Sequence, residues 1–209
     1  MVNNDMCMAE RPEILVMVPA GIKKAMDVGC SSGEVSGALK REFGCEVIGI
    51  EIDKEKAEIA SYKIDKVIVA DAETAVLPYD AGYFDCIIFA DVLEHLKSPL
   101  NALKKYLYYL NDNGALVISI PNVRHVSVIF ELVFKGEWKY RRSGIMDGGH
   151  IRFFTINSFM RVLKEAGVRP VRIRRIFSLK GSKIFNLLTL GIFREFLTAQ
   201  YIFLVKKYE

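Results

Sequence analysis

The stretch AMDVGCSSG at residues 25–33 decides the fold. The segment from Lys24 to Val28 predicts a strand before the turn, and a helical pattern from Glu34 to Phe43 follows the turn. Glycine allows the backbone to turn sharply and to approach a ligand closely. The free amides at the start of the following helix favour a carboxylate or a phosphate. We therefore predict a ligand-binding turn between the first strand and the next helix of an α/β sheet.

The glycine spacing limits the kind of ligand. Ser31 stands where the dinucleotide pattern G-x-G-x-x-G has its second glycine, and that glycine lets a pyrophosphate lie against the backbone. A ligand without phosphates is therefore favoured. Glu51 ends the second expected strand, 18 positions after Gly33, where a carboxylate accepts hydrogen bonds from both hydroxyls of a ribose. The alternative is an acidic residue that only opens the next loop, with Asp53 as a competitor.

Strand and helix patterns alternate along the chain, which predicts a mostly parallel sheet covered on both faces. The continuous apolar run from Tyr83 to Phe89 is typical of a central parallel strand. Weaker periodicity at about 122–154 predicts a substrate-side lid, and an apolar insertion is expected at about 178–200. No linker divides the chain, so residues 1–209 are expected to form one domain. Further strands are expected at 46–50, 66–69, 115–120, 171–177 and 201–206, and helices at 11–18, 54–62, 99–110 and 155–166. The run NDNG at 111–114 is expected to end the helix at 99–110.

The composition excludes several classes of protein. With 51% hydrophobic and 26% charged residues, it predicts a globular chain with a substantial core. The N-terminus has no apolar run of the signal-peptide kind, and Arg194 and Glu195 interrupt the longest apolar stretch. The cysteines form no C-x-x-C pair, so neither a zinc site nor a disulfide framework is indicated. We therefore expect a cytoplasmic protein with no transmembrane segment and no metal.

Basic residues concentrate in the second part of the chain. Residues 1–120 hold 12 Lys and Arg against 19 Asp and Glu, whereas residues 121–209 hold 17 against 6. This excess suits an anionic substrate, an anionic membrane surface or nucleic acid, or is only a solvated basic face. No RNA-binding motif accompanies it, so nucleic acid is not the expected partner. The apolar insertion is interpreted as core packing, a pocket-closing helix, or an interface for a partner subunit or lipid-linked substrate. Arg172 and Arg174 alternate as on the solvent side of an edge strand.

Five motifs in order resemble those of class I S-adenosylmethionine (SAM)-dependent methyltransferases, from about residue 24 to the end. The segment GIMDGGHIRFFT at 144–155 resembles a branch associated with polysaccharide and small-molecule biosynthesis, and other members of the wider family act on quinones. The resemblance implies a Rossmann-like sandwich with a seven-stranded, mostly parallel sheet and an antiparallel last strand. The five motifs are AMDVGCSSG at 25–33, VIGIE at 47–51, ADAE at 70–73, FDCIIFADVLEHL at 84–96 and GALVISIPN at 114–122.

The resemblance implies SAM as the cofactor and a role for each motif. Glu51 would bind the ribose, and Ile52 would pack on the adenine. Asp71 and the amide of Ala72 would bind the edge of the adenine. The usual glycine at position 31 is absent, and serine keeps the turn with less conformational freedom. The expected residues around the methionine part are Asp27, Gly29, Cys30, Ser31 and Gly33, and those near the transferred methyl are Ala90, Asp91 and Val92.

The expected acceptor is a small molecule or a saccharide, methylated on oxygen. Methylation of RNA or protein, or a non-catalytic SAM-binding module, are the alternatives. A hydroxyl acceptor needs a base, and imidazole titrates near neutral pH. We expect that base to be His150, oriented by Asp147, or His95, and each histidine also has an ordinary structural interpretation. A monomer or a homodimer is expected. The candidate substrate-binding residues are Asn122, His125, Tyr140 and Arg152.

Overall fold

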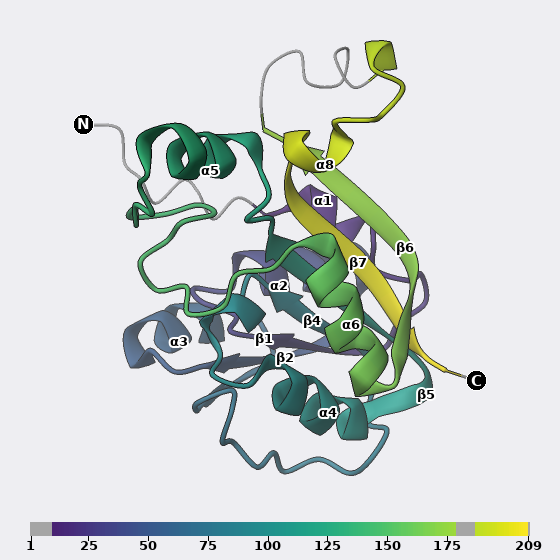
Figure 1. Ribbon diagram of the computed structural model, residues 1–209. Coiled ribbons are helices and arrows are strands. Elements are labelled where there is room, and N and C mark those ends of the chain that lie inside the picture. The colour runs from purple at the N-terminus through teal and green to yellow at the C-terminus, as the bar shows by residue number, and fades with distance from the viewer. Residues whose placement is uncertain (1–9, 179–186, 209) are drawn as a thin grey trace.

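Buried apolar strands form the centre of the molecule in the part of the chain that the computed structural model describes, residues 10–178 and 187–208. Within this part, seven strands form one sheet in the order β3-β2-β1-β4-β5-β7-β6 (Figure 1). They are β1 (Lys24–Val28), β2 (Glu46–Glu51), β3 (Lys66–Val69), β4 (Phe84–Ala90), β5 (Leu110–Pro121), β6 (Val168–Phe177) and β7 (Thr198–Lys207).

The strand directions confirm the expected sheet. Neighbours from β3 through β2, β1 and β4 to β5 pair in parallel. The last strand, β7, lies between β5 and β6 and runs antiparallel to both. The carboxyl ends of β1, β2 and β4 therefore meet at one edge of the sheet, which is where ligands bind in open α/β folds.

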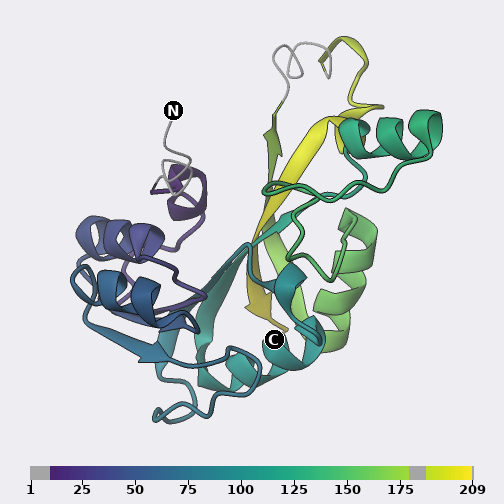
Figure 2. The same cartoon turned by 90° about the vertical axis from the view of Figure 1, so that its left-hand side faces the viewer.

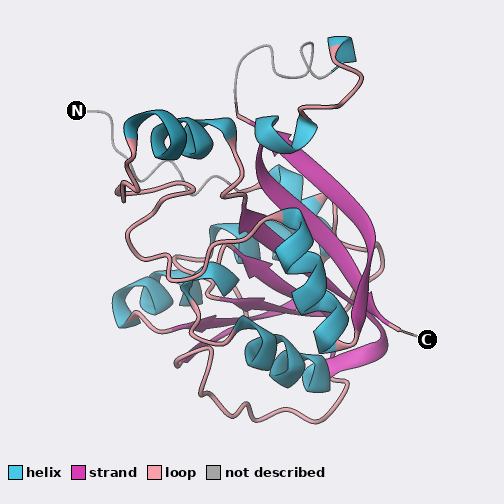
Figure 3. Cartoon of the chain, in the orientation of Figure 1, coloured by secondary structure: helices cyan, strands magenta, loops and turns pink. Residues whose placement is uncertain are grey.

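Helices cover both faces of the sheet (Figures 2 and 3). Tyr106 of α4 and Phe159 of α6 are fully buried in the apolar cluster on one face. Ile14 of α1 and Leu39 of α2 are fully buried in the cluster on the other face. The helical elements are α1 (Pro12–Leu15), α2 (Glu34–Phe43), α3 (Lys54–Ser61), the 3-10 turn η2 (Leu93–His95), α4 (Pro99–Tyr109), α5 (Val126–Phe130), the π-helical turn η3 (Glu131–Lys135), α6 (Ile156–Ala166) and α8 (Arg194–Leu197).

Helix α4 ends before the run at 111–114, but these residues belong to β5, whose expected start is Ala115. Phe84 pairs with Leu110, whereas Cys86 pairs with Ala115, so the residues between bulge out of the ladder. The side-chain amide of Asn111 donates to the Asp85 carboxylate over 2.6 Å and holds the bulge against β4. The polar run therefore widens one strand instead of separating a helix from it.

The boundaries of other elements also differ from expectation. The first helix covers only Pro12–Leu15, and the last two strands begin three residues earlier than expected, at Val168 and Thr198. Strand β6 lies at the edge of the sheet with Arg172 and Arg174 exposed, as the alternation indicates.

Two segments lie outside the regular layers. The first carries α5 and η3 and continues as a long loop to α6 (Figure 3). Of the apolar insertion, residues 179–186 lie outside the described residues, and the insertion ends where β7 begins. Within the described ranges, none of the helices has the length and hydropathy needed to cross a bilayer.

Candidate functional site

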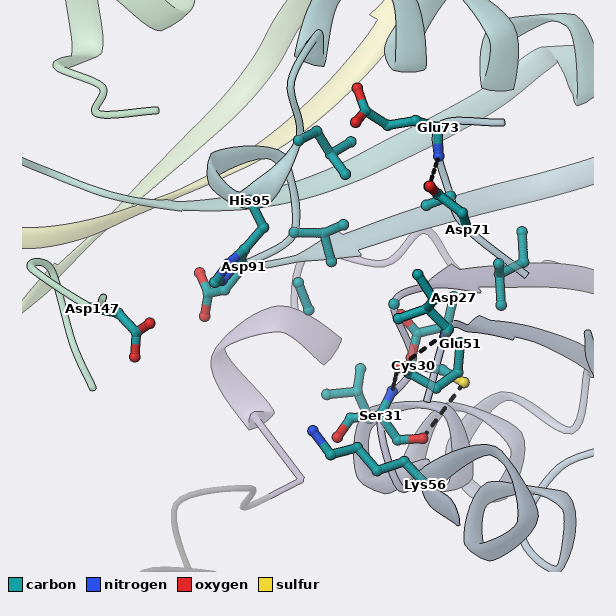
Figure 4. Close-up of a pocket in the computed structure, with 18 of the residues that line it drawn as sticks. Asp27, Cys30, Ser31, Glu51, Lys56, Asp71, Glu73, Asp91, His95 and Asp147 are labelled. Atoms are coloured by element: carbon teal, nitrogen blue, oxygen red, sulfur yellow. Dashed lines mark hydrogen bonds between the residues drawn. The ribbon is translucent and has the colours of Figure 1, made fainter. Parts of the chain in front are cut away.

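A cavity of about 750 Å³ lies at the carboxyl ends of β1, β2 and β4 (Figure 4). Its size falls within the range of small-molecule sites, roughly 300–1,000 Å³. The loops that follow these strands line one side, and the segment 143–151 contributes Ser143, Gly144, Asp147 and Ile151 to the lining. The structure thus brings together residues from both halves of the chain.

The glycine loop holds an unusual backbone conformation. Gly29, Ser31 and Gly33 have φ angles of 71°, 49° and 82°, all in the left-handed region. A side chain at Gly29 would place its Cβ 2.7 Å from a methyl group of Val92, so only glycine lets this loop pack against the loop after β4. Ser31 adopts the left-handed conformation that a glycine usually takes at this position. For a residue with a Cβ atom, this conformation costs free energy.

Glu51 joins the second strand to the glycine loop. Its carboxylate accepts a hydrogen bond from the amide of Ser31 at 2.8 Å and from the amides of Ile52 and Asp53 at 2.9 Å. A carboxylate offers about four acceptor positions, so at least one remains for a ligand hydroxyl. The side chain is 8% exposed and lines the cavity, which fixes its position at the cavity wall.

Asp27 lies at the floor of the cavity with one oxygen unsatisfied. Oδ2 accepts a hydrogen bond from the hydroxyl of Ser36 on α2, whereas Oδ1 is buried and has no partner in the described structure. Burial raises the pKa of Asp27 to about 7, and the Glu51 carboxylate adds to the rise. A buried acceptor without a donor is costly, so the geometry fits a ligand that brings a donor to Oδ1.

Asp91, after β4, is fixed by a network that reaches the N-terminal segment. Its φ is 58°, and its carboxylate accepts hydrogen bonds from Arg11 at 2.8 Å, from the hydroxyl of Ser119 at 2.6 Å, and from the amide of Gln200. Arg11 also donates to Gln200 at 3.1 Å. Arg11 itself lines the cavity, so the network closes one end of it.

Two histidines lie next to each other at this end of the cavity. His95 lines it, and its Nδ1 lies 3.0 Å from the carbonyl oxygen of Gly149. His150 stands behind it with ring centroids 4.7 Å apart, and its Nδ1 lies 3.0 Å from the carbonyl oxygen of Ile145. Because a carbonyl oxygen only accepts, both Nδ1 atoms carry the proton and both Nε2 atoms keep a lone pair. Burial lowers the pKa of His150, which keeps its ring neutral.

The charge of the lining is strongly acidic. Among the described residues of the lining, seven carboxyl groups face three Lys or Arg side chains. Such a cavity attracts a cationic ligand and repels phosphates. The carboxylates are Asp27, Glu34, Glu51, Asp71, Glu73, Asp91 and Asp147, and the basic residues are Arg11, Lys56 and Lys97.

Most of the predicted cofactor residues line this one cavity. Ile52 is two-thirds exposed at its rim, and Asp71 accepts a hydrogen bond from the amide of Glu73 at 2.7 Å. Gly33 is outside the lining and begins helix α2. The predicted cofactor residues in the lining are Asp27, Gly29, Cys30, Ser31, Glu51, Ile52, Asp71, Ala72, Ala90, Asp91 and Val92.

The structure does not bring the candidate substrate residues into the cavity lining. Asn122 is fully buried and donates to the carbonyl groups of Glu195 and Thr198 at 2.8 Å. His125 caps α5, and Arg152 donates to the carbonyl of Lys97. Tyr140 is half exposed and contacts Phe153. Of the candidate catalytic residues, His95 and Asp147 are in the lining and His150 is not.

Sequence reasoning missed several lining residues, of which Arg11 is the most informative. It reaches Asp91 across 80 positions of sequence, and nothing in its neighbourhood predicts that contact. Lys56, Glu73 and Lys97 were missed as well, because charged residues in loops and on helix surfaces carry no local signal of a ligand.

Comparison with known proteins agrees with this geometry. The family described as "Methyltransferase domain" matches residues 14–173, and the chain belongs to this family. A crystal structure of a SAM-dependent methyltransferase from Archaeoglobus fulgidus superposes with a TM-score of 0.70 at 19% identity, covering 97% of this chain and 94% of that one. At this identity the likeness shows the fold.

Two curated relatives carry the name ubiquinone biosynthesis O-methyltransferase. That of Acinetobacter baylyi is 23% identical over 153 residues, which cover 70% of this chain and 63% of the relative. That of Psychrobacter arcticus is 30% identical over 118 residues, which cover 53% of this chain and 46% of the relative. The chain therefore spans between about half and under two-thirds of the length of these relatives.

Proposed function

We propose that the chain binds SAM in this cavity and transfers its methyl group to an oxygen atom of a small molecule or a saccharide. The observation that carries the proposal is the acidic cavity in which Glu51 and the unsatisfied Oδ1 of Asp27 share one wall. Membership of the methyltransferase-domain family supports methyl transfer. The names of the curated relatives support an O-methyl product.

The residues present fit SAM in three respects. The free acceptor position of Glu51 suits a ribose hydroxyl. An ammonium group would give Asp27 Oδ1 the donor that it lacks. The excess of carboxylates suits a sulfonium cation, and it disfavours the pyrophosphate of a dinucleotide. Asp71 and Ile52 also line the cavity, and the resemblance assigns them to the adenine.

When bound, SAM supplies a methyl group that its positive sulfur has already activated. The protein's own residues then need only position the acceptor, exclude water and remove a proton. His95 is suited to the last task, because its Nδ1–H is held by the Gly149 carbonyl and its Nε2 is free to accept a proton from a hydroxyl. Asp91 and Asp147 lie beside it (Figure 4).

We also propose that the segment 122–154 forms the acceptor side of the cavity. Ser143, Gly144, Asp147 and Ile151 in the lining support this role. The amides of Ile151 and Arg152 donate to the backbone carbonyl of Glu94 at 3.0 and 2.9 Å, and they fasten this segment to η2.

Transfer of a tritiated methyl group from SAM tests the proposal. The full chain would be incubated with a catechol or quinol, with sugar nucleotides and with total RNA as separate acceptors. We expect label in a hydroxyl-bearing small molecule or sugar and none in RNA. His95→Ala is expected to lower kcat by at least about 100-fold with SAM affinity retained. Label that appears only in RNA or protein would overturn the proposed substrate class, and SAM binding without transfer to any acceptor would leave only a binding module.

A further inference from the structure

Glu94, between the cavity and the core, has an environment that folding alone does not explain. Its side chain is 0% exposed, and neither carboxylate oxygen has a hydrogen-bond partner in the described structure. A buried carboxyl group without a partner costs free energy, so an apolar residue of similar size would serve the core better.

The two histidines beside Glu94 are held in the tautomer that binds metal ions. Each has its Nδ1–H committed to a backbone carbonyl, His95 to that of Gly149 and His150 to that of Ile145. A hydrogen bond from the second ring nitrogen to a carbonyl is the usual support of a metal-bound histidine.

The three side chains are close enough to share one ion. One ligand atom from each of Glu94, His95 and His150 lies within 4.8 Å of the others, and His150 Nε2 is 3.9 Å from Glu94 Oε1. A tetrahedral zinc ion with bonds of about 2.0–2.1 Å separates its ligands by about 3.3 Å. Small side-chain rotations would therefore close the site. Gly149 leaves the room for His95, because a Cβ there would lie 3.2 Å from its ring.

We propose that Glu94, His95 and His150 bind a divalent transition-metal ion of the Zn²⁺ type at the wall of the cavity. Two imidazoles and one carboxylate form the ligand set of catalytic zinc sites and of other first-row divalent ions, whereas Mg²⁺ prefers oxygen ligands. The absence of a C-x-x-C pair, on which the expectation of no metal rests, does not bear on a site built from histidine and glutamate.

What the ion does rests on the proposed methyl transfer. His95 lines the cavity, so an open coordination position would face the acceptor. A divalent cation lowers the pKa of a hydroxyl beside it. With His95 Nε2 bound to the ion, His95 no longer accepts the proton as it would in the metal-free chain. The acceptor then loses its proton to the Asp147 carboxylate, which lines the same cavity, and from there to solvent. As the new O–CH₃ bond forms, the S–CH₃ bond breaks and its electron pair returns to sulfur, so the charge on sulfur is neutralised.

Metal titration of the full chain, stripped with a chelator and dialysed, tests the inference. We expect one Zn²⁺ per chain by calorimetry, and visible absorption bands when Co²⁺ takes its place. Glu94→Gln and His150→Ala should each weaken Zn²⁺ binding by at least about tenfold. His125→Gln is the matched control, because this histidine bonds to Ser127 and Ser178 away from the site. Its Zn²⁺ affinity should equal that of the wild type.

Thermal unfolding distinguishes a metal ligand from a structural residue. Glu94→Gln removes a buried ionisable group that has no partner, so without metal its unfolding temperature should equal or exceed that of the wild type. The rise in unfolding temperature that Zn²⁺ gives the wild type should disappear in this variant. A lower unfolding temperature in Glu94→Gln without metal, together with no effect of Zn²⁺ on the wild type, would show a structural role and overturn the inference.

The remaining outcomes separate this inference from the proposed function. SAM binding by the stripped chain without any stoichiometric Zn²⁺ or Co²⁺ binding would overturn the metal site and leave the proposed function standing. Zn²⁺ binding that depends on Glu94 and His150, in a chain that does not bind SAM, would support the metal site and overturn the proposed function. Binding of Mg²⁺ but not Zn²⁺ would contradict the ligand-set argument.

Discussion

Ser31 carries the most constrained backbone conformation that a side chain adopts in the glycine loop, with a φ of 49°. The left-handed region costs a residue with a Cβ about 1–2 kcal/mol. In this conformation the amide of Ser31 donates a hydrogen bond to the Glu51 carboxylate. The bond helps to hold Glu51 in the cavity lining. Serine in place of glycine at position 31 therefore raises the conformational free energy of the loop without changing its backbone path.

Substitutions at position 31 should follow this backbone cost. Ser31→Gly should keep the free energy of unfolding or raise it by up to about 1 kcal/mol, whereas Ser31→Val should lower it by about 2 kcal/mol, since a β-branched residue is a severe outlier there. Urea denaturation measures both. Ser32→Val is the control, because Ser32 does not share the positive φ. Equal losses at positions 31 and 32 would contradict the explanation.

Asp27 should give the chain a pH dependence near neutrality. Its pKa is raised from 3.8 to about 7, so the protonated form favours folding. That contribution to stability is complete below about pH 4 and is lost as the pH rises through about 7. Asp27→Asn should therefore be more stable than the wild type above pH 7, and the difference should vanish toward pH 4. Thermal unfolding between pH 4 and 8 measures it, and a constant difference would show that Asp27 does not titrate in this range.

Much of the cavity lining is predictable from short motifs, because the conformation and spacing of these residues are local properties. Gly29 and Glu51 lie in motifs whose spacing fixes them at strand ends, and both line the cavity. Arg11 and Glu94 could not be assigned in this way. Arg11 acts through a contact 80 positions away, and the significance of Glu94 lies in the hydrogen bonds that its carboxylate lacks.

At the scale of elements, strand and helix periodicity predicts the sheet and its flanking helices well. The largest error is the start of β5, expected at Ala115. Polar residues with glycine at 111–114 indicate the end of a helix, and only the pairing of β5 with β4 shows that they form a bulge within the strand. Strands β6 and β7 also begin earlier than expected, because their antiparallel pairing extends each strand beyond its apolar run.

The stability of helix α6 should depend on its N-cap residue, Thr155. The Thr155 hydroxyl accepts from the amide of Ser158 at 3.2 Å, and the Ser158 hydroxyl accepts from the amide of Thr155 at 2.9 Å. Because α6 buries Phe159 and Leu163, loss of the cap should reach the core. Thr155→Ala should lower the free energy of unfolding by about 1 kcal/mol, with exposed Asn157→Ala as the control. Urea denaturation in which both variants match the wild type would show that the cap contributes nothing.

At the scale of the whole molecule, the chain builds one cavity from two kinds of sequence. The first half supplies the strand ends that line one side of the cavity, and this part follows from regular patterns. The segment 122–154 crosses to the other side through irregular backbone. Its path is set by the contacts of Ile151 and Arg152 with the carbonyl of Glu94, which no periodicity predicts.

The central claim is that Glu51 and the glycine loop together bind the nucleoside of SAM, and calorimetry of the full chain with SAM and with NAD tests it most directly. We predict that the wild type binds SAM and not NAD. Glu51→Ala should bind SAM roughly 100-fold more weakly, because about 3 kcal/mol of charge-assisted hydrogen bonding is lost. Binding of NAD without SAM, or an unchanged SAM affinity in a folded Glu51→Ala variant, would contradict the claim.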